Sequence, residues 1–191
     1  VPLSLEKPTL CPEQAIKLCD ENTICIVPIA GVTWTGLNDD IEALNDELDK
    51  SNAKTGYNIP IHVDAASGGF ILPFTKPECK WDFRLKWVWS ISTSGHKYGL
   101  VYPGLGWVVW RDKSCLPEQM SFSVNYLGAN ITQVGLNFSR PAAQILGQYY
   151  NFIRYGADGY KEVQNGSMEI ARYCHEKIGK MKCFTNYSNS V

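Results

Sequence analysis

A lysine stands on a turn of small residues that follows an apolar, aromatic segment. The run 87–91 predicts a buried strand, and the segment 90–99 breaks into small side chains around Lys97. Lysine normally faces water, but glycines at 95 and 99 would let a backbone or a planar molecule approach closely. The pattern indicates either an amine nucleophile that forms a Schiff base with an aldehyde, or a solvated lysine on a surface turn.

An acidic residue at the end of another predicted strand favours the nucleophile. The segment 58–64 predicts a short strand that ends at Asp64 and is followed by Ala65 and Ala66. In an open α/β sheet, ligands bind beyond the carboxyl ends of the strands. A lysine and an aspartate at two such ends fit pyridoxal 5'-phosphate: the lysine holds its aldehyde as an imine, and the carboxylate keeps its ring nitrogen protonated. The small alanines would leave room for the flat ring.

Four motifs together carry this pattern, and two of them are the segments just described. They lie at 62–70, 92–99, 106–111 and 137–141. In this order and spacing they resemble the group II pyridoxal-phosphate-dependent decarboxylases, and glutamate decarboxylase in particular. Proteins of that family are considerably longer. The resemblance therefore implies that residues 1–191 are a fragment, the C-terminal part of the large domain of a fold-type I enzyme, without the small domain.

The resemblance also implies an activity. Full-length glutamate decarboxylases convert L-glutamate to γ-aminobutyrate and carbon dioxide through an external aldimine and a quinonoid. The segments that recognise the side-chain carboxylate of the substrate would lie outside this chain. We therefore expect the isolated chain to be inactive. The resemblance also implies a serine contact between subunits, so we expect the full-length protein to be a homodimer or a higher homo-oligomer.

The roles of individual residues follow from the same resemblance. Lys97, Asp64 and Tyr126 would be catalytic, the tyrosine reaching the active site from a loop and aiding protonation of the α-carbon. Ser139 would contact the cofactor phosphate of the neighbouring subunit. The remaining cofactor contacts would come, together with Asp64 and Lys97, from Thr33, Ala66, Ser94 and His96. Taken alone, each has an ordinary structural explanation, such as a threonine capping a turn or a structural histidine.

Three alternatives stay open. Aromatic-amino-acid decarboxylases share the aspartate and the lysine, but their lysine turn usually has asparagine and proline where this chain has Ser94 and Gly95. Sphingosine-phosphate lyase has a similar lysine turn but lacks the 137–141 motif. A non-catalytic remnant, serving as an oligomerisation module, could keep the fold without the chemistry.

The elements that would position these residues predict an α/β fold, a three-layer α/β/α arrangement with a mainly parallel sheet. The apolar run 24–30 indicates a strand covered on both faces, with Pro28 tolerated near its end. A helix should begin at Asp39 and Asp40 and end at Gly56, with a buried stripe of Ile41, Leu44, Leu48 and Ala53. A right-handed βαβ unit would then place Thr33 and Asp64 at the same edge of the sheet.

The other segments are expected to support this sheet. Pro12 begins a helix that runs to about Asp20, and the strand at 107–110 would, by resemblance, run antiparallel to its neighbours. Four aromatic residues in or next to a long loop should be packing anchors: Phe74, Trp81, Phe83 and Trp87. Ser139 is expected to cap a helix over 141–155. A last helix over 158–180 should cover the sheet through Val163, Met168, Ile170, Ala171, Cys174 and Ile178.

Composition narrows the class of protein. The chain has 18 lysines and arginines against 19 aspartates and glutamates, so no basic field would attract nucleic acid. No apolar run approaches the ~20 residues of a membrane helix, and the first residues do not resemble a signal peptide. The seven cysteines are scattered without a metal-ligand spacing, which predicts reduced thiols in a cytoplasmic protein and no metal site.

Overall fold

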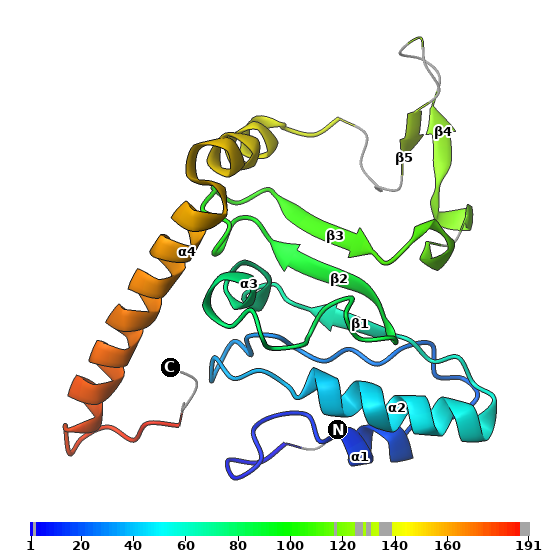
Figure 1. Cartoon of the computed structure of the whole chain (residues 1–191), viewed down its shortest axis with the longest axis horizontal. Coiled ribbons are helices and arrows are strands. Elements are labelled where there is room, and N and C mark those ends of the chain that lie inside the picture. The colour runs from blue at the N-terminus through cyan, green and yellow to red at the C-terminus, as the bar shows by residue number, and fades with distance from the viewer. Residues whose placement is uncertain (2, 117, 125–127, 129–130, 134–138, 188–191) are drawn as a thin grey trace.

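The computed structural model describes residues 1, 3–116, 118–124, 128, 131–133 and 139–187. Figure 1 shows a small sheet with helices on one side and a long helix beside the ends of the strands. The helices are α1 (Pro12–Lys17), α2 (Ile41–Thr55), α3 (Leu72–Thr75) and α4 (Ala143–Gly179). The strands are β1 (Ile61–Asp64), β2 (Val88–Ser94), β3 (Gly106–Trp110), β4 (Phe122–Val124) and β5 (Ile131–Gln133).

The main sheet is mixed. β1 pairs with β2 in parallel, and β3 pairs with β2 antiparallel, as predicted for the segment 107–110. On the other side of β1, Ile26 and Ile29 form parallel bridges with Ile61 and Asp64. The α/β fold class is thereby confirmed. The short β4 and β5 pair with each other in a separate antiparallel hairpin.

The predicted strand at 24–30 is reduced to isolated bridges. Ile26 donates its backbone N–H to the Pro60 carbonyl, and Ala30 donates to the Asp64 carbonyl. Between them a parallel ladder needs a donor at position 28, where proline has none. Pro28 can only accept, and its carbonyl receives the N–H of Asp64. The prediction of a continuous strand was wrong because the proline lies in the middle of the ladder.

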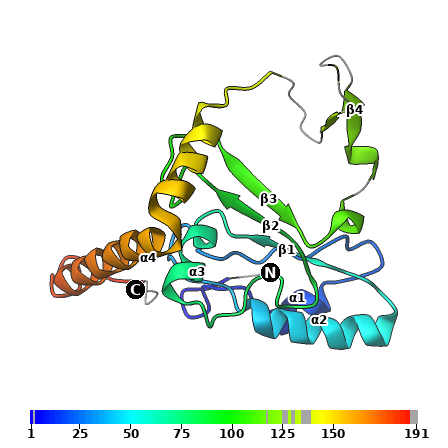
Figure 2. The same cartoon turned by 45° about the horizontal axis from the view of Figure 1, so that its top comes forward.

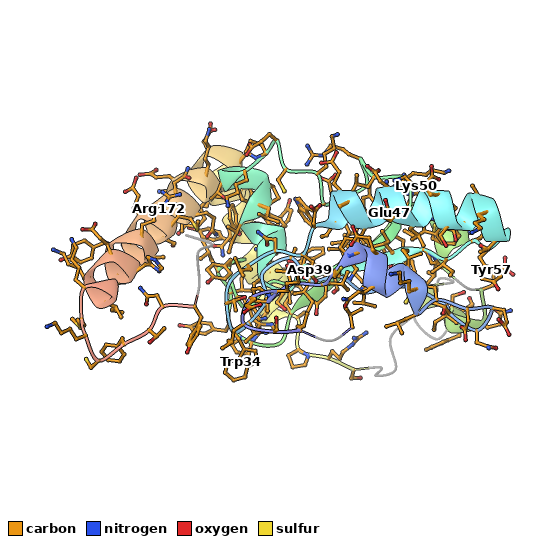
Figure 3. All side chains as sticks on the ribbon, turned by 90° about the horizontal axis from the view of Figure 1, so that it is seen from below. Trp34, Asp39, Glu47, Lys50, Tyr57 and Arg172 are labelled. Carbon is orange, nitrogen blue, oxygen red and sulfur yellow. The ribbon has the colours of Figure 1, made fainter. Side chains whose placement is uncertain are left out.

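Helix α2 forms as predicted because both of its ends are capped. The Asp40 side chain accepts the N–H of Ala43 at 2.9 Å, and Gly56 ends the helix in the left-handed conformation (φ 79°). Ile41, Leu44 and Leu48 are buried against the sheet. The outer face carries the ion pair of Glu47 and Lys50, with 2.6 Å between Oε1 and Nζ (Figure 3).

Two asparagines replace the last residue expected in the buried stripe of α2. Ala53 is exposed, whereas Asn45 and Asn52 are buried. The Asn45 side chain accepts the N–H of Trp87, and that of Asn52 bonds both the N–H and the carbonyl of Ile59. These bonds fix α2 to the segments that enter β1 and β2. Of the predicted packing anchors, Trp81 and Trp87 are buried, and Phe74 and Phe83 are half-buried.

The two faces of the sheet differ. Helices α1 and α2 lie on one face (Figures 1 and 2). Across the other face the pairing aligns one row of residues from neighbouring strands: Ile29, Asp64, Ser92 and Val108. Ile29 and Val108 are 36% and 50% exposed in the part of the chain that the structure describes. Asp64 therefore lies on the open face of the sheet.

Helix α4 joins the two predicted C-terminal helices across a kink at Gly156 (φ 57°, ψ −166°). Its N-cap is Ala142, so the prediction that Ser139 caps the helix was wrong. The prediction that the second half covers the sheet was also wrong. That half extends beyond the sheet (Figure 1), and four of its predicted contact residues are exposed: Ile170, Ala171, Cys174 and Ile178. Val163 and Met168 are half-buried.

Two further observations concern the described residues. No helix among them is long and apolar enough to cross a bilayer, and no group of three or more metal-binding side chains occurs among them. All seven cysteines lie in the described part, and none of them forms a disulfide there.

Candidate functional site

Lys97 lies in the turn that follows β2 and faces a cavity. Its Nζ donates to the Ser67 hydroxyl at 3.4 Å, the long distance of a weak bond. The cavity has a volume of about 510 Å³, and its lining includes Thr33 and Ser67 besides Lys97. The segment 31–33 follows residues 26–30, which form the isolated bridges beside β1 and are called here the outer bridge segment. The segment 67–71 follows β1. Residues of both segments thus line one cavity with the lysine.

Asp64 ends β1 at the same edge of the sheet. It is paired with Ser92 of β2, two residues before the strand ends. One of its carboxylate oxygens accepts the N–H of Ala66 at 3.0 Å, which bends the chain away from the strand. Its backbone carbonyl accepts the N–H of Ala30, and this bond aligns the loop that contains Thr33 with the end of β1. Thr33, Asp64 and Lys97 therefore lie on three adjacent segments at one edge.

A histidine on this face was missed from the sequence. His62 lies between two serines of β2, with Nδ1 2.7 Å from the Ser90 hydroxyl and Nε2 3.2 Å from that of Ser92. Burial lowers the pKa of His62, and the charge of Asp64 opposes this in part. Because side chains alternate along a strand, the spacing of His62 and Asp64 already indicated that they share a face.

For the remaining predicted site residues that it describes, the structure gives a position but no side-chain hydrogen bond to the Lys97 amine or the Asp64 carboxylate. Ala66 and Ser94 are half-buried near the ends of β1 and β2, and Ser139 is exposed. The His96 ring is exposed, and its Nδ1 lies 3.1 Å from the Leu105 carbonyl, which can only accept, so Nδ1 carries the proton. Tyr126 lies outside the described residues.

Comparison with known proteins identifies the family. Residues 6–189 match the pyridoxal-dependent decarboxylase conserved domain. The chain belongs to the pyridoxal-dependent decarboxylase family. It is 54% identical over 189 residues to the glutamate decarboxylase beta of Listeria monocytogenes, covering 99% of this chain and 41% of that protein. It is 54% identical to glutamate decarboxylase 5 of Arabidopsis thaliana, covering 100% of this chain and 39% of that protein.

Two solved structures are similar to this chain over nearly its whole length. Glutamate decarboxylase of Lactobacillus brevis superposes with a TM-score of 0.95 at 47% identity, over 100% of this chain and 43% of that one. Sphingosine-1-phosphate lyase of Burkholderia pseudomallei superposes with a TM-score of 0.78 at 26% identity, over 95% of this chain and 41% of that one. The chain thus spans about 40% of the length of the curated relatives it matches. The fold is that of the fold-type I enzymes.

The cofactor of a pyridoxal-dependent decarboxylase is pyridoxal 5'-phosphate, and the residues at the sheet edge fit it. The amine of Lys97 has one weak hydroxyl partner and no carboxylate partner among the described residues, so it is available to an aldehyde. Asp64 likewise has no cationic partner among these residues, and it is half-buried, as an acid that stabilises a protonated ring nitrogen should be.

Proposed function

We propose that the full-length protein decarboxylates L-glutamate to γ-aminobutyrate and carbon dioxide, with pyridoxal 5'-phosphate as cofactor. In this proposal, residues 1–191 supply the C-terminal part of the large domain. The observation that carries the proposal is the identity of 48–54% with curated glutamate decarboxylases over 96–100% of this chain. The lysine and aspartate at one edge of the sheet supply the matching chemistry.

Lys97 and Asp64 carry the central roles. Lys97 would hold the cofactor covalently through Nζ, which must be neutral to react. Asp64 would hold a proton on the ring nitrogen. When bound, the cofactor supplies a conjugated ring that accepts the electron pair released as the bond between the α-carbon and the carboxylate breaks. The open face around Asp64 lets a planar group lie against the end of the sheet.

The other residues would bind or orient. Thr33, Ala66, Ser94 and His96 would contact the cofactor within one subunit. The proton on Nδ1 of His96 is engaged by the Leu105 carbonyl, so Nε2 is directed elsewhere and can serve a polar group of the cofactor. Two roles reach further: Ser139 would contact the cofactor phosphate of a neighbouring subunit, and Tyr126 would deliver a proton to the α-carbon.

Two observations favour glutamate decarboxylation over the reaction of a sphingosine-phosphate lyase. The glutamate decarboxylase structure is more similar in sequence, at 47% against 26%, and in fold, with a TM-score of 0.95 against 0.78. A non-catalytic remnant would have no need to keep the lysine amine beside a cavity and without a carboxylate partner among the described residues. We further propose a homo-oligomeric protein of the cytoplasm, since the proposed role of Ser139 needs a second subunit.

The test uses the purified full-length protein and a panel of amino acids with carbon dioxide as the readout. We expect release from L-glutamate, together with a yellow absorbance of the bound cofactor. Lys97→Ala should abolish both, whereas Lys54→Ala, on the exposed end of α2, should change neither. Release from another amino acid alone, or an unchanged absorbance in Lys97→Ala, would contradict the proposal. The 191-residue chain by itself should release no carbon dioxide.

A further inference from the structure

The residues directly after Lys97, 98–100, are hydrogen-bonded to side chains of helix α4. Four α4 side chains bond three consecutive backbone carbonyls. Gln148 Nε2 and the Tyr160 hydroxyl donate to the Gly99 carbonyl at 2.8 and 2.9 Å. Gln164 donates to the Tyr98 carbonyl at 2.9 Å, and Asn151 donates to the Leu100 carbonyl at 2.8 Å. The bonds come from both sides of the Gly156 kink, so both halves of α4 converge on this one loop.

Gln148 occupies the centre of this contact. Its side chain is fully buried, and its second amide hydrogen bonds the Tyr160 hydroxyl at 2.8 Å, closing a triangle with the Gly99 carbonyl. A Cβ atom added at Gly95 or at Gly99 would lie 2.7 Å from Gln148 Oε1. The glycines on either side of Lys97 are therefore needed to admit this glutamine, and the glutamine fills the space between the two ends of the turn.

The backbone at this point is strained. Leu100 has φ 65°, and it is the one residue other than glycine with a positive φ among those the structure describes. A leucine in this conformation persists only where surrounding contacts hold it. The bond from Asn151 to its carbonyl and the two bonds to Gly99 supply that restraint. The restraint is next to the lysine, and none of Gln148, Asn151 and Tyr160 lines the cavity.

We propose that Gln148, together with Tyr160, is a positioning residue for Lys97, an inference that rests on the proposed role of Lys97 as the cofactor-binding amine. The loop closes on itself through the bond from the Val101 N–H to the Gly95 carbonyl at 3.3 Å. Gln148 sets the shape of that closed loop and thereby the direction in which the lysine side chain leaves it. Neither residue lines the cavity, so both act through the backbone.

Two variants of the full-length protein test this role. Gln148→Glu keeps the shape of the side chain but removes both amide donors and sets a carboxylate against the Gly99 carbonyl. Tyr160→Phe removes one hydroxyl and keeps the ring, which stacks on Phe70 and Phe74. Gln144→Glu is the matched control, because it makes the same chemical change one turn earlier on α4 at a residue that bonds no loop carbonyl.

The first readout is amide hydrogen exchange of the protein without cofactor. We expect Gln148→Glu to accelerate exchange of the 97–101 amides about tenfold, with the β1 amides unchanged and with a smaller increase for Tyr160→Phe. The second readout is cofactor affinity, with a dissociation constant raised about tenfold in Gln148→Glu. In turnover, kcat should fall while KM for glutamate stays the same. Gln144→Glu should leave all of these at wild-type values.

Each outcome bears on the proposal. Faster exchange with unchanged cofactor affinity and unchanged kcat would reduce Gln148 to an anchor of α4 and overturn the positioning role. Unchanged exchange at 97–101 would overturn it directly. If Gln148→Glu does not fold, Tyr160→Phe decides by the same two readouts. Absence of cofactor absorbance in the wild-type protein would instead refute the proposed function, and the exchange measurement would still report whether α4 holds the loop.

Discussion

Asp39 is the residue whose loss should loosen the edge of the sheet most. It lies just before α2 (Figure 3). Its side chain is buried, with 8% of the residue exposed. One carboxylate oxygen accepts the N–H of Leu10 at 2.8 Å, and the other accepts that of Ile29 at 2.7 Å. A single side chain thus joins the N-terminal segment, the outer bridge segment of the sheet and the start of α2. Asp39→Ala removes both acceptors at once.

The cost can be worked from these two bonds. A hydrogen bond to a charged group contributes about 1.5–3 kcal/mol net, and both backbone donors would be left in a largely buried place. Because water can reach part of the site, we expect Asp39→Ala to lower the free energy of unfolding by about 3–5 kcal/mol. Asp39→Asn keeps the size and one acceptor, so about half of that loss should follow. Asp40→Ala removes the exposed N-cap next to it and should cost about 1 kcal/mol.

Urea-induced unfolding of the full-length protein, followed by the fluorescence of the tryptophans, measures this series. The chain carries six tryptophans, and Trp81 and Trp87 belong to the core that α2 covers. The expected order of destabilisation is Asp39→Ala, then Asp39→Asn, then Asp40→Ala, with similar slopes against urea. If Asp39→Ala unfolds at the same urea concentration as Asp40→Ala, the two buried acceptor bonds do not stabilise the fold as argued.

Two further predictions concern the sheet. Burial lowers the pKa of His62, so below a pH of about 6.5 the unfolded state binds a proton that the folded state does not. The free energy of unfolding should therefore decrease as the pH is lowered from 7.5 to 5.5, and His62→Gln should remove part of that decrease. Urea midpoints at the two pH values measure it, and an equal decrease in both proteins would contradict the argument. Thr93 Oγ1 is buried without a hydrogen-bond partner among the described residues, so Thr93→Val should stabilise by about 1 kcal/mol. Thr75→Val is its control and should not stabilise, because the Thr75 hydroxyl bonds the Ile71 carbonyl.

Local chemistry made part of the molecule predictable. Helix α2 could be bounded because Asp40 and Gly56 are strong end signals that act within one turn. The placement of Thr33 and Asp64 at one edge followed from the βαβ rule, which depends on the order of elements rather than on contacts. The lysine turn stood out because small residues surround a long charged one. The roles assigned to these residues stay predictions until the variants are measured.

The rest depended on partners distant in the chain. The apolar run at 24–30 indicated a strand, but whether Pro28 would interrupt it depended on which residues of β1 face it. Ser139 is a good N-cap residue by type, yet the helix begins only after Ala142. Buried Gln148 and Asn52 had no signal, since a polar residue becomes a core residue only when a remote carbonyl needs a donor.

The kink at Gly156 has a consequence for how the chain can vary. Gln148 and Gln164 stand on opposite sides of it and bond adjacent carbonyls of one loop. Inserting or deleting one residue between them would rotate one glutamine by about 100° around the helix axis relative to the other and withdraw it from its carbonyl. This stretch of α4 should therefore accept many exchanges of exposed side chains among homologous proteins, while its length stays fixed.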